Sequence, residues 1–450
     1  MPDTADHDGH GTEDVLDGPV HDDPPRPPRT SFHRRRDFIA VALIVVAVVA
    51  GWALIGTTSD FAATSSQTAS DNVETPEAPS TLPPSFGEAW RAPSDATPIP
   101  VAVGPTVVTG NGREVIGRDP LTGKERWRYA RDIPLCTVGE GFNDAVALFR
   151  KPSNALSSND PYKQGNCSEV TSLDATTGER DHQRNGDAEK DTQLLSGGSH
   201  LTTTDGKRLI NTWRNDLVQT MEYGAVPDIA NPDKQPRVGC TYGSIAVTQG
   251  RIGVIERCPS ASDATVTGDD RLTVYNPDGK ENESDTPIVF FSNTVGGSRA
   301  QIIAMNENYT AIALPDPSRI QVYDSEGKRI GEYPISVPES DFANDPARGV
   351  VSVTKSNEAV FWFTGTRTIG LTSTDFRPLW TVENTLGPGV IFAGYLLLPV
   401  KDAYLVTDPV TGARVAQTAV NRDEYNGPVQ MSTLGPMVLE QRGSTLVALR

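Results

Sequence analysis

The stretch VVTGNGREVIGRDPLTGKERWRY, residues 107–129, decides the fold class of this chain. It predicts two β-strands separated by a turn at Gly110 and Gly112, followed by a third strand that carries Trp127. A D-x-x-T-G turn at residues 119–123 joins the second and third strands. An Asp side chain caps the backbone amides of such a turn, and Gly supplies its positive φ. The stretch is therefore a β-meander.

The D-x-x-T-G turn recurs along the chain. It returns at residues 174–178 and 408–412, and in degraded form at 276–279 and 324–327. The first strands of the repeats are predicted to begin at intervals of about 35 to 65 residues, near Val107, Val146, Leu201, Ile245, Ala311, Val360, Leu396 and Val438. Such a period indicates a repeat architecture, and no amphipathic helix interrupts it. We therefore expect an all-β propeller of eight blades, with seven as the alternative because the middle repeats are irregular.

The two ends of the repeat region complement each other. The C-terminal segment GPMVLEQRGSTLVALR supplies only two strands, whereas GEAWRAP at residues 87–93 resembles an isolated outer strand with its own Trp. We predict that this N-terminal piece completes the last blade and closes the ring, so that the propeller domain covers residues 88–450.

One apolar segment precedes the repeats. FIAVALIVVAVVAGWALIG, residues 38–56, carries no charge and as a helix spans roughly 28 Å, close to the thickness of a bilayer core. A cleaved signal peptide has a shorter apolar core and a shorter leader. Five arginines precede the segment, and no Lys or Arg occurs between Thr57 and Trp90. The positive-inside rule predicts a single-pass plasma-membrane anchor with a cytoplasmic N-terminus and an extracytoplasmic propeller.

The segments that flank this helix are predicted to lack regular structure. Residues 1–37 combine acids and arginines with few large apolar side chains, which is typical of a disordered cytoplasmic tail. Residues 57–87 are rich in Ser, Thr and Pro, which is typical of a flexible tether.

The charge of the chain excludes one class of partner. The 40 basic and 58 acidic residues give a formal net charge of −18, whereas nucleic-acid binding needs a basic surface. Residues 38–450 carry 35 basic and 49 acidic side chains, which leaves −14 on the predicted outer side. That charge favours a soluble domain repelled by an anionic bilayer.

The four cysteines all lie in the propeller region, where an even count outside the cytoplasm favours disulfides. Of three pairings we predict Cys136–Cys167 and Cys240–Cys258, because each closes a loop between neighbouring strands of one blade. A metal site is the competing interpretation, but the sequence has no C-x-x-C, and His182 and His200 are distant in sequence. We predict no metal.

Catalytic motifs are absent from the sequence. It has neither H-E-x-x-H nor G-x-S-x-G. Ser199 precedes His200, but neighbours in a strand point to opposite faces. Acidic clusters at 263–270 and 281–285 do not fit a regular calcium loop and are predicted to be solvated. We therefore expect a protein without enzymatic activity or cofactor.

Two features suggest a binding site. Residues 223–242 form a long Pro-rich connection, and connections longer than about a dozen residues are usually functional or disordered. An aromatic set on predicted strands is the second feature, with packing between blades as the alternative. The ligand- or partner-binding candidates are Trp213, Tyr223, Lys234, Arg237 and Trp362.

The D-x-x-T-G turn followed by Trp resembles the quinoprotein-type (PQQ-like) propeller repeat. In that family the dehydrogenases use two adjacent cysteines and an acidic calcium site. No two cysteines are adjacent here, so the resemblance implies the fold and not the dehydrogenase activity.

The order of acidic tail, arginines, span, tether and propeller, with the segments ERWRY, RDIPLCTVG, KQPRVGCTYGS and GRIGVIERCP, resembles the membrane-anchored propellers of mycolate-making actinobacteria. The resemblance implies a cell-envelope biogenesis factor that supports polar growth. It implies two partners, the glycolipid trehalose monomycolate and the inner-membrane exporter of mycolate glycolipids. A protein-only scaffold of an envelope complex is the alternative, and a PQQ-dependent dehydrogenase is a third hypothesis.

Overall fold

The computed structural model describes residues 35–58, 62–71, 73–150, 166–204, 207–226, 235, 237–259, 268–281 and 283–450. It divides the chain into two units, Met1–Ala62 and Ala63–Arg450. The predicted acidic tail, apart from its last three residues, lies outside the described residues.

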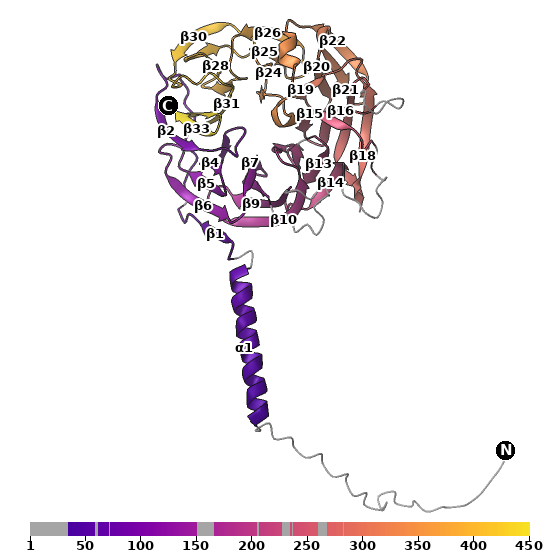
Figure 1. Ribbon diagram of the computed structural model, residues 1–450. Helices are drawn as coiled ribbons and strands as arrows, with labels where there is room; N and C mark the ends of the chain where they lie inside the picture. Colours follow the sequence, from indigo (N-terminus) through magenta and orange to yellow (C-terminus); the bar gives the residue numbers. More distant parts are fainter. Residues whose placement is uncertain are drawn as a thin grey trace, which may run out of the picture. The chain divides into compact units, whose positions relative to one another are not determined.

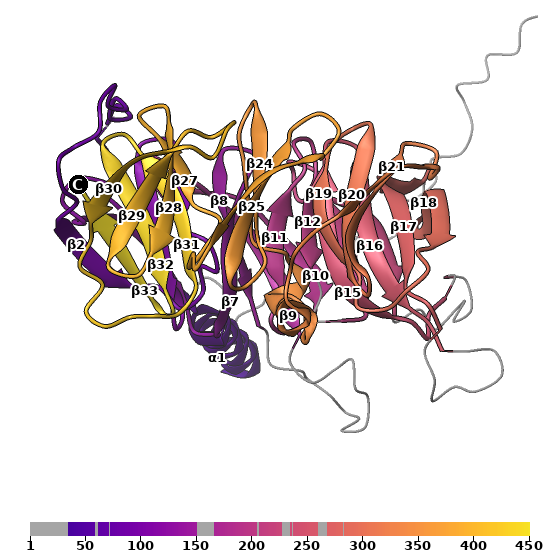
Figure 2. The ribbon, with the colours of Figure 1, turned by 90° about the horizontal axis from the view of Figure 1, so that it is seen from above.

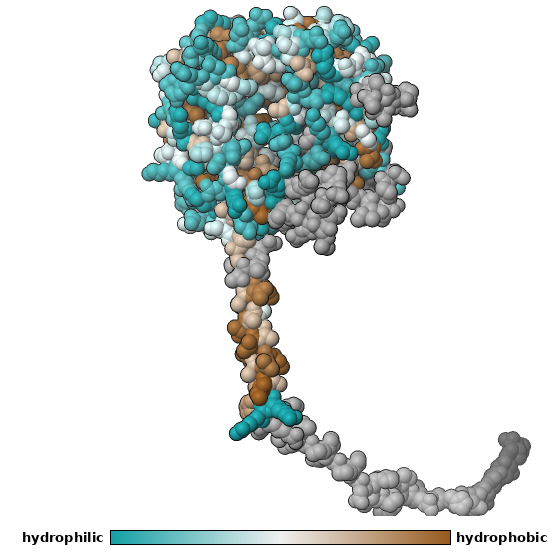
Figure 3. Space-filling view, viewed as in Figure 1, coloured by the Kyte–Doolittle hydropathy of each residue, from teal (hydrophilic) through white to brown (hydrophobic). Residues whose placement is uncertain are grey.

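The described residues of the first unit form the helix α1 (Arg35–Thr58). Within it, Arg35–Gly56 contains an 18-residue window with a mean hydropathy of 2.9 and is long and apolar enough to cross a membrane. Its surface is predominantly hydrophobic (Figure 3). The helix begins three residues before the predicted span and ends two residues after it.

The second unit is an eight-bladed β-propeller, as the sequence predicted (Figure 1). Its eight antiparallel sheets stand side by side around the ring, as the edge-on view in Figure 2 shows. Successive blades pack face to face through apolar side chains, so the core is a series of layers between blades.

The strands of each blade are as follows, in chain order. Blade 1 contains β3 (Val101–Val103), β4 (Thr106–Asn111), β5 (Glu114–Arg118) and β6 (Glu125–Arg131); blade 2 contains β7 (Leu135–Gly141), β8 (Asp144–Phe149), β9 (Cys167–Asp174) and β10 (Arg180–Ala188). Blade 3 contains β11 (Gln193–Ser196), β12 (Leu201–Thr204), β13 (Leu209–Trp213) and β14 (Gln219–Gly224); blade 4 contains β15 (Thr241–Thr248), β16 (Arg251–Arg257), β17 (Arg271–Lys280) and β18 (Glu283–Thr294). Blade 5 contains β19 (Gln301–Met305), β20 (Tyr309–Pro315), β21 (Ser318–Asp324) and β22 (Arg329–Pro334); blade 6 contains β23 (Val353–Lys355), β24 (Ala359–Phe363), β25 (Arg367–Thr372) and β26 (Pro378–Glu383). Blade 7 contains β27 (Val390–Phe392), β28 (Tyr395–Val400), β29 (Ala403–Thr407) and β30 (Arg414–Ala419), and blade 8 contains β31 (Val429–Leu434), β32 (Met437–Arg442) and β33 (Thr445–Leu449).

Blade 8 is completed by the N-terminal part of the unit. Strand β2 (Glu88–Pro93) pairs antiparallel with β33, which confirms the predicted closure of the ring. Trp90 of β2 is buried and donates a hydrogen bond to the Pro120 carbonyl in blade 1, at 2.8 Å.

Most of the positions predicted as starts of first strands lie instead in the second strand of a blade. Seven of the eight lie in the second strand of a blade, as Val107 does in β4, and only Ile245 lies in a first strand. Second strands are buried on both faces between neighbouring blades, so they form the clearest apolar runs. First strands line the centre of the ring, and in blades 1, 5, 6 and 7 they are shorter than the second strands.

The predicted tether over residues 57–87 needs correction. Strand β1 (Thr64–Gln67) pairs antiparallel with the outer strand β6 and gives blade 1 a fifth strand. Further along, Pro76 approaches Gly435, and Phe86 forms a bridge with Val420. The outer edge of β6 offers backbone groups that a Ser/Thr-rich strand can satisfy, and composition does not reveal this pairing. Only residues 59–63 separate α1 from β1.

The D-x-x-T-G turns have the predicted geometry. In the first, the Asp119 carboxylate accepts hydrogen bonds from the amides of Leu121 at 3.1 Å and Thr122 at 2.8 Å, and Gly123 has φ 69°. The turns at 174–178 and 408–412 repeat these contacts.

Each of these turns receives the Trp of the preceding blade. Trp127 of β6 is fully buried and donates to the Ala175 carbonyl in blade 2, at 3.0 Å. Its ring covers Gly178, where a Cβ would lie 2.6 Å from the indole. Trp380 makes the same contact with the turn that contains Gly412. The repeat motif therefore joins neighbouring blades.

Asp144, at the start of β8, gives the stability of blade 2 a pH dependence. Burial, aided by the nearby Asp174 and Asp181 carboxylates, raises the pKa of Asp144 to about 6. The folded protein then binds a proton that the unfolded chain has released, so this group lowers stability as the pH rises from about 4 to 6.

We expect Asp144→Asn to raise the free energy of unfolding at pH 7.5 by about 1 kcal/mol, since water screens part of the effect at this half-buried site. The gain should vanish at pH 4. Chemical denaturation at both pH values measures it, and a variant equally stabilised at both would contradict the explanation.

Candidate functional site

Both predicted disulfides form, and they lie on one face of the ring. Cys136 pairs with Cys167, and Cys240 pairs with Cys258. In a four-stranded antiparallel blade, the start of the first strand and the hairpin between the second and third strands lie at the same face of the ring. We call this the disulfide face. The D-x-x-T-G turns lie at the opposite face.

A polar cavity of about 490 Å³ opens at the disulfide face. It lies between the hairpins of blades 3 and 4, the start of blade 5, and the connection between β22 and β23 with its short helices η1 (Glu339–Phe342) and η2 (Ala347–Gly349). Its charged lining residues are Asp191, Lys207, Arg257, Arg299, Asp345 and Arg348. Four cations therefore face two carboxylates, and the volume suits a small-molecule site.

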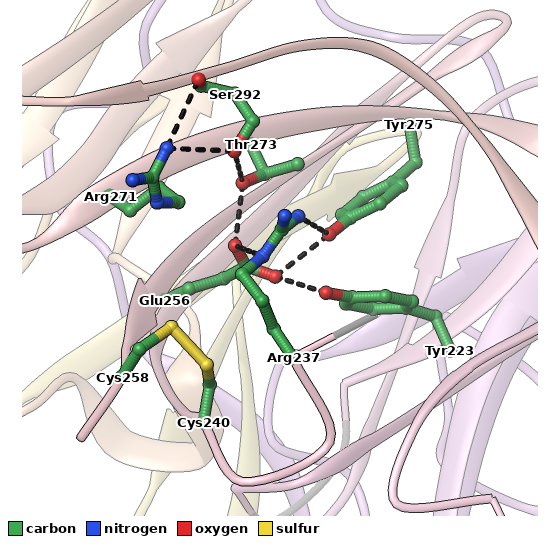
Figure 4. The surroundings of a disulfide bond; sticks show 9 residues. All are labelled: Tyr223, Arg237, Cys240, Glu256, Cys258, Arg271, Thr273, Tyr275 and Ser292. Carbon is green, nitrogen blue, oxygen red and sulfur yellow. Dashed lines mark hydrogen bonds and ion pairs between the residues drawn. A yellow bond between two sulfur atoms is a disulfide. The ribbon is translucent and has the colours of Figure 1, made fainter. Parts of the chain in front are cut away.

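The wall of this cavity in blade 4 rests on a buried cluster around Glu256 (Figure 4). The Glu256 carboxylate accepts hydrogen bonds from the hydroxyls of Tyr223, Tyr275 at 2.7 Å and Thr273 at 2.6 Å. The Arg237 Nε donates to the same carboxylate at 2.9 Å. We call these five residues the Glu256 cluster. Because the carboxylate is fully buried, its charge needs all these partners.

The ionisation states in the cluster suit a structural role. Burial and the adjacent Glu256 carboxylate raise the pKa values of Tyr223 and Tyr275 well above their ordinary range. Burial opposes the charge of Arg237, but the Glu256 carboxylate outweighs it and raises the pKa of the guanidinium. Both phenols therefore remain hydrogen-bond donors, and the cluster holds strands together instead of transferring protons.

The second disulfide connects the Glu256 cluster to the cavity. Tyr242 and Arg257 both line the cavity, and they lie close to Cys240 and Cys258 in the sequence. The Tyr242 ring stacks on the ring of Tyr223, with centroids 6.0 Å apart. The disulfide and the cluster thus fix two lining residues.

The centre of the ring contains two further cavities. One, of about 170 Å³, has an apolar lining that includes Leu195, Val247 and Ile303. The other, of about 240 Å³, includes Glu140 and Ser432. The two share the lining residues Ile99, Gln193, Leu195 and Ser196. We call them together the channel cavities, and both have mainly apolar linings with a few polar side chains.

Two charged groups lie in the channel cavities. Desolvation lowers the pKa of Lys355 and raises that of Glu140. Both side chains are accessible to water, but the inner strands around them exclude much of the bulk solvent. The Lys355 ammonium donates to the Met305 carbonyl, at 3.4 Å. A ligand in the channel would meet only these few charges among apolar side chains.

The sequence-predicted binding residues separate into two groups. Tyr223 and Arg237 meet in the Glu256 cluster, behind the polar cavity. Trp213 and Trp362 are buried in apolar layers between blades, as the alternative interpretation held. Lys234 lies outside the described residues.

Sequence reasoning missed the cavity residues themselves. Lys207, Arg257, Arg299 and Arg348 come from four separate segments, and no motif connects them. One indication was available, since Glu256 and Arg257 immediately precede Cys258 and thus lie beside a cross-link.

The prediction for Ser199 and His200 also needs correction. They lie in the turn before β12 and not in a strand, and the Ser199 hydroxyl is 2.9 Å from the His200 Nδ1. The His200 Nε2 is 3.0 Å from the exposed Asp278 carboxylate. This row of hydrogen bonds joins the turn before β12 in blade 3 to β17 in blade 4, outside the cavities described above. Among the described residues, no group of three or more His, Cys, Asp or Glu side chains is placed to hold a metal ion.

Comparison with known proteins gives similarities of fold only. No family model matches the sequence, and no curated protein matches it significantly. The chain is similar to the crystal structure of BamB from Moraxella catarrhalis, with 12% identity, a TM-score of 0.49, and coverage of 81% of this chain and 99% of that one. It is also similar to the computationally designed Ika8 protein, with 12% identity, a TM-score of 0.49, and coverage of 79% and 96%. The quinohemoprotein alcohol dehydrogenase from Comamonas testosteroni gives 11% identity, a TM-score of 0.48, and coverage of 81% and 76%.

At such low sequence identities, these similarities of fold give no information about activity or ligands. The topology of the chain itself defines its class. It is an eight-bladed all-β propeller that follows a helix long and apolar enough to span a membrane.

Proposed function

We propose that this protein is a non-enzymatic, single-pass membrane protein whose extracytoplasmic propeller binds an amphiphilic glycolipid in the channel cavities. By the resemblance drawn from its sequence, the glycolipid is trehalose monomycolate, and the protein acts beside the inner-membrane exporter of mycolate glycolipids. It would then be a cell-envelope biogenesis factor that supports polar growth, in the group that includes polar growth factor A.

The observation that carries the proposal is the composition of the channel cavities. Leu195, Val247 and Ile303 offer an apolar surface for part of an acyl chain. Glu140 and Ser432 in the second cavity, with Gln193 and Ser196, which line both cavities, offer hydrogen-bond partners for sugar hydroxyls. A ligand that combines a hydrocarbon chain with sugar hydroxyls matches this mixture of apolar and polar side chains.

The distribution of charge around α1 supports the proposed orientation. Arg35 and Arg36 begin the helix, and Arg26, Arg29 and Arg34 precede it. No basic residue follows until Arg91. The positive-inside rule then assigns the N-terminus to the cytoplasm and the propeller to the outer side of the plasma membrane.

Leu195→Gln tests the proposed lipid site, because Leu195 lines both channel cavities. We expect trehalose monomycolate to bind the full-length protein in detergent and the variant to bind at least about tenfold more weakly, since its amide is desolvated against the acyl chain. Calorimetric titration measures both affinities. Val415→Gln on the outer strand β30 is the matched control, because Val415 is exposed and should not affect binding.

Two results would contradict the proposal. One is a wild-type protein that does not bind trehalose monomycolate, and the other is a Leu195→Gln variant that binds as the wild type does. If cross-linking in native membranes trapped the exporter while no lipid bound, the protein-only scaffold would replace this proposal.

A further inference from the structure

We propose that the polar cavity at the disulfide face binds a phosphate group carrying two negative charges. This site is separate from the channel cavities and does not depend on the proposed glycolipid function. The site is defined by the charges that line the cavity, by the partners that some of them lack, and by the contacts that hold part of its wall.

The charge of the cavity is opposite to that of the domain around it. Its lining has four cations and two carboxylates, a net charge of +2, whereas residues 38–450 carry −14. Asp270 and Glu339, which do not line the cavity, pair with Arg257 and Arg299, so the attraction for a dianion rests on the other two cations, Lys207 and Arg348, beside low-dielectric walls that strengthen their field. An acidic domain is soluble without a cationic cavity, so solubility does not explain the charge of this lining.

The carboxylates near the cavity neutralise only some of the cations. Arg257 is paired with Asp270 at 3.3 Å and with Asp345 at 2.5 Å. Arg299 is paired through one nitrogen with the exposed Glu339, at 2.6 Å. Arg299 therefore keeps further N–H donors for a ligand.

Lys207 and Arg348 are the cations that a ligand would neutralise. Among the described residues, neither side chain has an ion pair or hydrogen bond, and both line the cavity. An ammonium and a guanidinium together suit a phosphate, because Arg donates a planar pair of N–H groups and Lys adds a compact charge.

The Arg257 side chain and the backbone at Arg348 are held in place before any ligand binds. Arg257 is held by two carboxylates and by the Cys240–Cys258 disulfide beside it. Arg348 lies in a tight turn with φ 55°, closed by a hydrogen bond from the Gly349 amide to the Pro346 carbonyl at 2.9 Å. Part of the cavity wall is therefore ordered in advance, which limits the conformational entropy lost on binding.

Arg348→Gln in the full-length protein tests the site with inorganic phosphate as the probe. We expect the wild type to bind phosphate and Arg348→Gln and Lys207→Gln each to bind it at least about tenfold more weakly, because each removes a charge-assisted hydrogen bond. Calorimetric titration in a phosphate-free buffer measures this. Lys401→Gln is the matched control, since Lys401 is an exposed cation in the β28–β29 turn and its loss should leave binding unchanged.

A second titration identifies the source of the phosphate. Competition by short-chain phosphatidic acid, but not by short-chain phosphatidylcholine, would assign the site to an anionic lipid headgroup. Binding of inorganic phosphate without competition by phosphatidic acid would assign it to a soluble phosphate compound. Thermal melting of each variant shows whether it remains folded.

The proposal is overturned if the wild type does not bind phosphate, or if Lys401→Gln weakens binding as much as Arg348→Gln does. The latter result would show only a general effect of net charge. Neither result bears on glycolipid binding, which is measured separately with Leu195→Gln.

Discussion

Replacing Trp127 with Ala is expected to lower the free energy of unfolding by about 3–5 kcal/mol. The Trp127 side chain is fully buried between blades 1 and 2, where it covers Gly178 and donates a hydrogen bond to the Ala175 carbonyl. Alanine would remove this apolar contact, leave a cavity, and leave the carbonyl without its donor. Urea denaturation followed by circular dichroism measures the change.

Gly178 provides the complementary test of the same contact. A Cβ at Gly178 would lie 2.6 Å from the Trp127 ring, and the residue has φ 73°. Gly112 has φ 63°, and a Cβ there would meet no atom within 4 Å, so Gly112→Ala isolates the backbone cost of about 1–2 kcal/mol. We expect Gly178→Ala to destabilise the protein more than Gly112→Ala does. Equal losses of stability in the two variants would show that the packing of Trp127 does not depend on its close approach to Gly178.

Replacing Glu440 with Ala is expected to cost about 3–5 kcal/mol of stability. The buried Glu440 carboxylate in β32 accepts hydrogen bonds from Arg422 at 2.7 Å, Tyr404 at 2.6 Å and Arg442 at 2.6 Å. Arg422 is itself completely buried. Without Glu440, two guanidinium groups would remain in the interface between blades 7 and 8 with no carboxylate to balance them.

Glu440 also gives this interface a dependence on pH. Burial favours the protonated acid, but the Arg422 and Arg442 charges outweigh it and hold the pKa of Glu440 below its ordinary value. The contribution to stability is therefore complete above the unfolded-state pKa of about 4.3 and is lost as the pH falls through the lowered folded-state value.

The ionised and protonated states of Glu440 can be distinguished by measuring the free energy of unfolding at pH 7 and near pH 3. The deficit of Glu440→Ala should be largest at pH 7 and should shrink in acid. Glu424→Ala is the control, because Glu424 is exposed in the connection before β31 and should change stability little. A deficit that is constant with pH would contradict a role for the ionised carboxylate.

The sequence predicted the propeller because its decisive residues act locally. Asp119 and Gly123 interact within one turn, and Trp127 follows four residues later, so the pattern repeats wherever a blade repeats. The closing strand was also predictable, because Trp90 lies in a strand-like segment that had no partner nearby in sequence. The cysteine pairs followed from the short loops that they close.

The candidate site could not be predicted in the same way. Lys207, Arg257 and Arg348 lie in different blades or connections, and only the closed ring brings them around one cavity. Glu256 is a single acid in an apolar strand, and its partners Tyr223 and Tyr275 come from separate strands. The pairing of β1 was missed because a Ser/Thr-rich sequence suits both a free linker and an edge strand.

The pairing of β2 with β33 sets the order in which the ring can form. Strand β2 is synthesised hundreds of residues before Thr445–Leu449, so it must wait without its partner while seven blades are made. Contacts so distant in sequence form slowly, and an unpaired strand edge invites aggregation in the meantime. A chain that stopped short of β33 could not complete blade 8, and strand β2 would have no partner to close the ring. Such chains should be recognised by proteases as open rings, which couples correct assembly of the propeller to completion of its synthesis.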